Sequence, residues 1–250
     1  MENHDPLKEI VNPQQYKIIK DLVHNPDATV DNALQQIVDL ILTAHATPNE
    51  EEYFTPGNVD YYTSLGLMNL VQDLEPTKHR KLVEFLYGLQ KRTARDPSSG
   101  EPFRTQGNIF WTDLPSCGYT ELEIWQEFGG GYKDPGTLKL RNEQRQRWLK
   151  LTAFIAQFNQ AADVSYEPPL DQGYNIHPLD RPHRAVQTFQ LVLENDDAPM
   201  HRLAKTATME ATCIWSIYSA DRLWKMSDMV GLTVWTLDWG WGVRVSRIGG

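Results

Sequence analysis

Apolar residues recur every three to four positions over most of the chain, and this spacing predicts a series of amphipathic helices. The first predicted helix opens at Asn12 and Pro13, an N-cap residue and a proline suited to the first turn, and it stops at Asn25-Pro26. Thr29 is placed to cap the second predicted helix. The apolar stripe of this second helix consists of Ala33, Leu34, Ile37, Leu40, Ile41 and Ala44.

Two more helices are predicted before residue 100. The third runs from about Asp60 to Leu74, and the fourth opens at Pro76-Thr77 and ends before the loop-forming residues 96–100. The apolar positions that mark their buried sides are Leu67, Leu70, Val71, Leu74, Leu82, Phe85, Leu86 and Leu89.

The second half of the chain alternates irregular segments with longer helices. Residues 101–136 are the least regular, although Thr120 is placed to cap a short helix there. Helices are then predicted over residues 138–160 and 184–194, and the longest apolar helix over residues 199–225. The stripe of this last helix is Leu203, Ala207, Ile214, Ile217, Tyr218 and Trp224.

Patterns that predict β-strands are scarce compared with the patterns that predict helices. Apolar and polar residues alternate with period two only over residues 230–245, where glycines interrupt the alternation. The chain has no internal repeat and no linker that would separate two cores. We therefore predict an all-α fold, a single irregular bundle of about eight helices over residues 1–229, followed by an atypical Gly- and Trp-rich tail over residues 230–250.

Charge and hydropathy narrow the classes of partner. The 250 residues include 24 Lys and Arg against 33 Asp and Glu, which gives a net charge of −9. This balance disfavours nucleic acid and anionic membranes, because both are bound through clustered basic residues. No stretch reaches the roughly 18–20 apolar residues that span a bilayer. We expect neither a nucleic-acid partner nor a membrane partner, and the oligomeric state is left open.

The two cysteines and the N-terminal sequence suit a reducing compartment. The N-terminal residues do not form a secretory signal, and no glycosylation sequon occurs. These features predict a cytoplasmic location, with the nucleus left open. Cys213 falls in an apolar helix and is expected to be buried and inert, whereas Cys117 falls in a loop and is expected to be the more accessible thiol.

Motifs that carry chemistry are missing from the sequence. It has no CxxC, HExxH or Glu-x-x-His pattern of metal ligands, and it has no Gly-x-Ser-x-Gly turn for a nucleophile. We therefore predict no cofactor and no metal, and the sequence names no reaction.

Glu210 is the most informative carboxylate, and it anchors a candidate pocket. It falls on the line of Ala207 and Ile214, which places it on the predicted core side of the last helix. A buried carboxylate must be paired, hydrogen-bonded or protonated, and it can serve in acid–base chemistry. The favoured alternative is a structural salt bridge, to Arg184 or to another helix. The candidate pocket consists of Trp111, Asp113, Glu210 and His177.

The order of several segments resembles a fungal family known as domain of unknown function 3632. The similar segments, within roughly residues 30–225, are residues 67–71, 81–86, 111–115, 148–156, 193–194 and 211–215, together with Trp125. The resemblance implies a fungal, all-helical, cytosolic protein, and it implies no reaction and no catalytic residues. The sequence departs from the family over residues 230–250, which are interrupted by glycines where similar proteins end in a basic, Trp-rich helical segment.

Two hypotheses about function follow. The leading one is a non-enzymatic protein-interaction or accessory factor, because no reaction motif is present and the tail carries apolar residues. The alternative is a small-molecule-binding protein or enzyme with an interhelical pocket that carries a buried carboxylate. Nucleic-acid binding would become attractive only if Arg141, Arg145, Arg147 and Lys150 joined a wider basic face.

Overall fold

The computed structural model describes residues 14–49, 54–105, 107–127, 142–162, 182–194, 199–230, 235–238 and 242–245 of the chain. Within these ranges helices make up most of the structure, which confirms the all-α fold class. The helices are α2 (Gln14–His24), α3 (Val30–Ala46), α4 (Pro56–Asp73), the 3-10 helix η1 (Pro76–Lys78), α5 (Arg80–Gln90), α6 (Pro115–Glu127), α7 (Asn142–Ala161), α8 (Pro182–Leu193), α9 (Met200–Leu203), α10 (Ala207–Tyr218) and α11 (Ala220–Val230).

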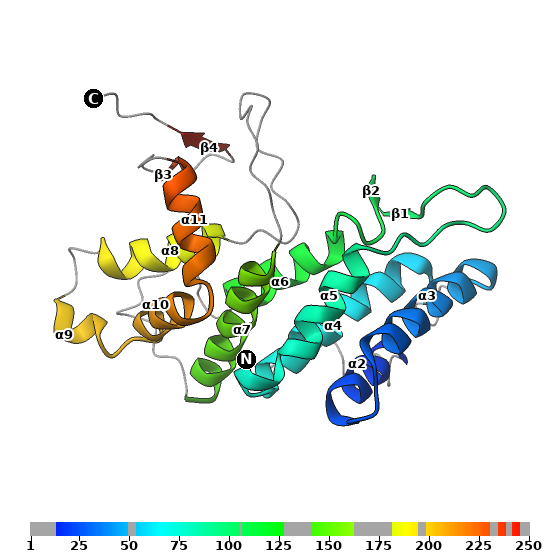
Figure 1. Cartoon of the computed structure of the whole chain (residues 1–250), viewed down its shortest axis with the longest axis horizontal. Helices are drawn as coiled ribbons and strands as arrows, with labels where there is room; N and C mark the ends of the chain where they lie inside the picture. The colour runs from blue at the N-terminus through cyan, green and yellow to red at the C-terminus, as the bar shows by residue number, and fades with distance from the viewer. Residues whose placement is uncertain are drawn as a thin grey trace.

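Helices α2 to α5 lie toward one end of the molecule and α8 to α11 toward the other, with α6 and α7 between them (Figure 1). Helix α4 packs against α2, α3, α6 and α7, and α7 packs in turn against α5, α10 and α11. The core is continuous through these two helices. Its largest fully buried side chains include Phe85, Phe110, Trp111, Trp125, Phe154 and Trp215.

Helix α2 ends and α3 begins where local chemistry predicts, while the predicted start of the first helix at Asn12 and Pro13 lies outside the described residues. Thr29 caps α3, because its hydroxyl oxygen accepts the backbone N–H of Asn32. The turn before α3 is tied to α5 by Lys81, whose ammonium group donates to the carbonyl oxygens of Leu22 and Ala28 at 3.1 and 3.0 Å. This amine therefore satisfies one carbonyl in the last turn of α2 and one in the turn that follows.

Helix α4 begins four residues earlier than the sequence pattern predicts. Thr55 is its N-cap and accepts the N–H of Asn58, and Pro56 occupies the first helical turn. The earlier start adds a full turn to the helix. As a consequence, Asp60 lies inside the helix and is buried.

The irregular segment after α5 holds a short pair of antiparallel strands and an early start to α6. Strand β1 (Arg104–Thr105) pairs with β2 (Asn108–Ile109). Helix α6 begins at Pro115, five residues before the predicted cap Thr120. Leu114, which precedes it, has φ of 43°, a left-handed conformation that is uncommon for a side chain of this size.

The predicted helix over residues 199–225 is wrong as a single element, because the structure has three shorter helices there. Helix α9 ends at Leu203, and Thr206 caps α10 by accepting the N–H of Met209. Ser219 then separates α10 from α11. The predicted apolar stripe assumed one uninterrupted helix, so it assigned Ile217 and Trp224 to the core, whereas both are exposed.

The C-terminal segment with period two contains the second pair of strands. β3 (Trp235–Asp238) and β4 (Gly242–Val245) are antiparallel, with Trp235 opposite Val245. The division of the chain at residue 229 stays a prediction. Among the helices in the described part of the chain, none combines the length and apolar character needed to cross a bilayer.

Candidate functional site

Glu210 lies at the surface of α10, so the expectation that it faces the core is wrong. Its carboxylate accepts two hydrogen bonds from the guanidinium of Arg145 on α7, with Nε–Oε2 and Nη2–Oε1 distances of 3.0 and 2.6 Å. The interpretation of Glu210 as a structural ion pair fits this geometry, but its partner is Arg145 and not Arg184.

The error arose from the phase of α10. Apolar residues occupy most of the circumference of this helix, so their spacing only weakly determines which side is buried. The buried side consists of Thr208, Ala211, Thr212 and Trp215. This line is rotated by one residue from the predicted line through Ala207 and Glu210, and one residue corresponds to about 100° around a helix.

The other members of the candidate pocket are not gathered around Glu210. Trp111 is fully buried, whereas Asp113 is exposed and accepts the backbone N–H of Ile109 at 2.8 Å. Both follow β2, while Glu210 lies on α10 toward the opposite end of the molecule (Figure 1). His177 lies outside the described residues. As a ligand pocket this set of four stays a prediction.

A buried carboxylate does lie beside Trp111, and it belongs to Asp60. Asp60 is 2% exposed on α4, and the hydroxyl of Ser116 on α6 donates to its Oδ2 atom. The indole N–H of Trp111 lies close enough to influence the carboxylate, although it forms no hydrogen bond of ordinary geometry. Sequence reasoning missed Asp60 because it put the residue at the start of the helix.

The electrostatic state of Asp60 is unusual. Burial raises its pKa from 3.8 to about 6, and the donors Ser116 and Trp111 lower it only in part. Among the described residues, no Lys, Arg or His forms an ion pair with Asp60. The carboxylate is therefore ionised at neutral pH without a cation to balance it, an arrangement typical of acid–base sites.

A second buried carboxylate, Glu121 on α6, is fully balanced. The guanidinium of Arg184 on α8 donates to both of its oxygens, with Nε–Oε1 and Nη2–Oε2 distances of 2.9 and 3.3 Å. The same guanidinium lies 4.7 Å from the ring centre of Trp125. This bidentate pair with a cation–π contact joins α6 to α8 and has the character of a structural link.

His79 is another buried ionisable group, and it lies just before the start of α5. Burial lowers its pKa to about 4, so the ring is neutral at physiological pH. Its Nε2 lies 3.0 Å from the carbonyl oxygen of Val71, and the ring meets Phe154 edge-on at 5.7 Å. These contacts place His79 in the packing of α4, α5 and α7, away from Asp60.

The basic residues of α7 do not form a free positive face. Arg145 is paired with Glu210, Lys150 with Glu75 at 2.9 Å, and Arg147 lies 3.9 Å from Asp73. Arg141 lies outside the described residues. Within the part of the chain that is described, no cluster of His, Cys, Asp and Glu is arranged to hold a metal ion.

The accessibility of the two cysteines is the reverse of the expectation. Cys117 is buried, because the early start of α6 places it on the inner side of that helix. Cys213 is exposed, because it lies one turn after Glu210 on the outer side of α10. The expectation for Cys117 was wrong because the start of α6 was placed too late. The expectation for Cys213 was wrong because, as for Glu210, the buried side of α10 was misassigned.

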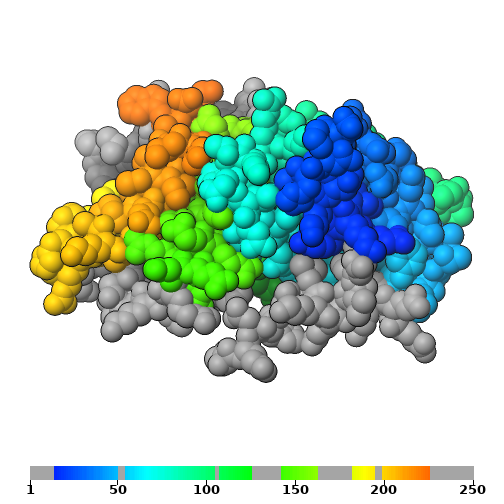
Figure 2. Space-filling model, turned by 90° about the horizontal axis from the view of Figure 1, so that it is seen from below, coloured from blue at the N-terminus to red at the C-terminus, as the bar shows by residue number. Residues whose placement is uncertain are grey.

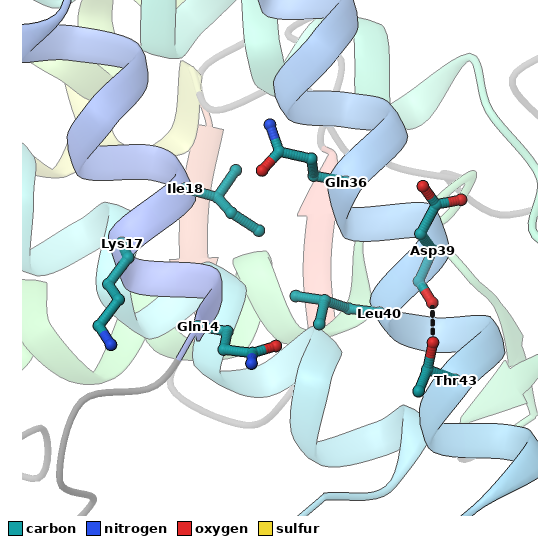
Figure 3. A pocket seen from close by; sticks show the side chains of 7 residues that line it. All are labelled: Gln14, Lys17, Ile18, Gln36, Asp39, Leu40 and Thr43. Atoms are coloured by element: carbon teal, nitrogen blue, oxygen red, sulfur yellow. Dashed lines mark hydrogen bonds between the residues drawn. The ribbon is translucent and has the colours of Figure 1, made fainter.

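A shallow groove runs between α2 and α3 (Figure 3). Its volume is about 350 Å³, with Ile18 and Leu40 between the helices and Lys17 and Asp39 on opposite sides. Most of its walls are exposed residues, so a small ligand there would stay largely in contact with water. Its lining residues are Gln14, Lys17, Ile18, Gln36, Asp39, Leu40 and Thr43.

Large apolar side chains are exposed on the C-terminal helices. Ile217 on α10 and Trp224 on α11 are each 71% exposed, and Leu193 and Met200 are also exposed. In Figure 2 part of the orange segment, which contains α10 and α11, protrudes from the surface of the molecule.

Comparison with known proteins identifies a family. A family model described as "Protein of unknown function (DUF3632)" matches residues 65–238, which is more than half of the chain. No curated protein and no solved structure matches the chain.

Proposed function

The chain belongs to the family of proteins of unknown function DUF3632, and on that premise we propose that it is a non-enzymatic helical factor that binds a protein partner. The observation that carries the proposal is the exposure of Ile217 and Trp224 on two successive helices. Single exposed apolar residues are common, but tryptophan is prominent among the residues that supply binding energy in protein interfaces. Such side chains lose their contact with water when a partner covers them.

The proposal includes the class of partner and the compartment. A net charge of −9 and the pairing of Arg145, Arg147 and Lys150 with carboxylates support a protein rather than nucleic acid. The presence of only two cysteines supports a reducing, cytoplasmic location.

Affinity capture from a native extract tests this function. The full chain and the double variant Ile217→Glu/Trp224→Ala serve as baits, and the variant Tyr119→Ala serves as the matched control. Tyr119 is a large exposed aromatic on α6, away from α10 and α11. We expect a protein that binds the wild type and the control but is lost with the double variant, and that binds again when purified. A chain that captures nothing, or captures the same proteins with every bait, would argue against the proposal.

A second candidate function rests on Asp60. A buried, unbalanced carboxylate beside Trp111 supports the alternative of a small-molecule-binding protein or enzyme with an interhelical site. Thermal-shift screening against a metabolite library tests it, since a ligand at a hundredfold excess over its Kd stabilises the folded state by about 2.7 kcal/mol. A rise in unfolding temperature that a compound causes in the wild type but not in Asp60→Asn supports a site at Asp60. If no compound raises the unfolding temperature, only the protein-binding function remains supported.

A further inference from the structure

We propose that Ser116 is a nucleophile and Asp60 its general base, in a site that hydrolyses an uncharged ester. This inference deepens the second candidate function and rests on it. It names the reacting residues and the substrate class of the same site. The hydrogen bond from the Ser116 hydroxyl to the Asp60 carboxylate supplies the geometry, because a base must lie within hydrogen-bond reach of the proton that it removes.

The state of the carboxylate suits a base. Asp60 is buried with no cationic partner among the described residues, so a proton that it accepts relieves an unbalanced charge. The pair Ser98–Asp96 offers an internal comparison, with an Oγ–Oδ1 distance of 2.7 Å. There, hydrogen bonds from Ser98 lower the pKa of Asp96 to about 2 at a site that is only partly buried, which makes Asp96 a much weaker base.

The backbone around Ser116 suits a nucleophile. Leu114 has the left-handed φ of 43°, and the chain turns there directly into α6. The first backbone hydrogen bond of α6 runs from Gly118 to Leu114, so the N–H of Ser116 precedes the intrahelical ladder. An N–H in this position can donate to the oxyanion that forms when the serine oxygen attacks a carbonyl.

The surroundings of Ser116 define the substrate class. Ser116 is half-buried, while Tyr119, one turn further along α6, is exposed. The neighbouring Glu123 raises the pKa of Tyr119 through a hydrogen bond and through its charge, and burial, followed by the charge of Glu123, raises the pKa of Tyr61. Aromatic surface favours an apolar group, and the carboxylate of Glu123 repels an anion. An uncharged ester with an apolar acyl or alcohol group fits both features.

The reaction is balanced without a co-reactant other than water. Asp60 accepts the proton of the Ser116 hydroxyl while the oxygen attacks the ester carbonyl carbon. The carbon–oxygen bond to the alcohol then breaks, and Asp60 returns the proton to the departing alcohol. Water, deprotonated by Asp60, then attacks the carbonyl carbon of the acyl–Ser116 ester. The bond from that carbon to the serine oxygen breaks, and Asp60 returns the proton to the serine oxygen, so the products are a carboxylic acid and the free serine.

A fluorophosphonate probe tests the nucleophile directly on the full chain. We expect one adduct, located on Ser116 by peptide mass spectrometry, and none on Ser98. Ser116→Ala should abolish labelling, and Asp60→Asn should slow it about a hundredfold or more, since a general base contributes roughly 10²–10⁴-fold. The labelling rate should rise about tenfold per pH unit below pH 6 and level off above it, following the ionisation of Asp60.

Hydrolysis of p-nitrophenyl butyrate by the same variants provides a second readout, with circular dichroism to show that each variant is folded. No adduct on the folded wild type, or a labelling rate that Asp60→Asn leaves unchanged, would overturn the proposal. The outcome for the candidate function is separate. A metabolite whose thermal shift depends on Asp60, without any adduct, preserves the binding site and removes the nucleophile. An adduct without such a metabolite preserves the nucleophile and leaves its natural substrate to be found.

Discussion

Glu121 and Asp60 are both buried carboxylates that involve α6, and the protein balances them in opposite ways. Glu121 faces a guanidinium with two hydrogen bonds and an aromatic ring behind it. Asp60 accepts a hydrogen bond from a serine hydroxyl and lies near the indole N–H of Trp111, and both of these groups are neutral. Burial of a carboxylate without a cation destabilises the folded state, so a purely structural site would be more stable with a cation beside Asp60 or with a neutral amide in its place. The comparison therefore separates a carboxylate that an arginine balances from one that has only neutral groups beside it.

The largest effect is expected when the balanced pair is broken. Arg184→Ala leaves Glu121 buried without its cation, which costs about 3–5 kcal/mol of folding stability. Urea denaturation measures the loss. As a control, Arg80→Ala removes an exposed pair with Glu84 and should leave the unfolding midpoint unchanged. A loss from Arg184→Ala no larger than that of the control would contradict the description of this pair as a link.

The next effect comes from Asp60 and depends on pH. Because its folded pKa is raised, Asp60 binds a proton in the folded state at pH values where the unfolded chain has lost it. Its contribution to stability is full below pH 3.8 and is lost as pH rises through about 6. The difference in unfolding free energy between wild type and Asp60→Asn should therefore change by about 3 kcal/mol between pH 8 and pH 3.5, in favour of the wild type at low pH.

The partly buried Asp96 provides the control for this profile. Its pKa is lowered to about 2, so its contribution is lost only as pH falls through that value. Asp96→Asn should thus keep a constant difference from wild type between pH 8 and pH 5. A flat difference for Asp60→Asn as well would show that Asp60 is not desolvated in the folded state.

His79 should reveal a slope of the opposite sign. Its pKa is lowered from 6.5 to about 4, so its contribution is present above pH 6.5 and is lost as pH falls through 4. Between pH 4 and 6 the contributions of Asp60 and His79 oppose each other in the wild type. As pH rises through this interval, the unfolding free energy of His79→Gln should therefore fall relative to that of the wild type. The unfolding free energy of Asp60→Asn should rise relative to that of the wild type. Equal slopes for the two variants would contradict this assignment.

A smaller effect is expected from Ser116→Ala. The variant removes a donor to the ionised Asp60 and should cost about 1–3 kcal/mol at pH 8, with little change at pH 3.5, where the carboxyl is protonated. It should also raise the pKa of Asp60, because the hydrogen bond from Ser116 lowers it. NMR titration of the Asp60 carboxyl carbon measures this shift, and a lowered pKa would be inconsistent with the geometry.

The smallest effect belongs to the carboxylate that the sequence singled out. Glu210→Gln weakens a partly exposed pair with Arg145 and should cost less than about 1 kcal/mol. Thermal unfolding of Glu210→Gln and Arg184→Ala under the same conditions compares the stability lost at the two ion pairs. A cost for Glu210→Gln that approached the cost of Arg184→Ala would remove the distinction between surface and buried pairs.

Helix existence could be predicted because it depends on local spacing. Thr29 marks the start of α3 by chemistry that acts within one turn, whereas Pro76 opens only the 3-10 helix η1 and α5 begins at Arg80. The all-α fold follows from the scarcity of period two. Helix boundaries were harder to predict than the helices themselves, because α4 and α6 begin at Pro56 and Pro115, inside segments whose composition resembles a loop. With α4 started at Pro56, Asp60, Ser64, Leu67 and Val71 form one helical line, and all four are buried.

The sequence by itself determined the fold class, the family and most of the apolar core, because burial of regularly spaced apolar residues is a local pattern. The burial of a carboxylate depends instead on which side of a helix meets its neighbours. Glu210 and Asp60 each lie among apolar residues, yet only Asp60 lies where α4 meets α6. The pairing of Ser116 with Asp60 joins residues 56 positions apart. Only the tertiary structure decides such contacts, since packing sets the phase of a helix when its sequence is apolar on several sides.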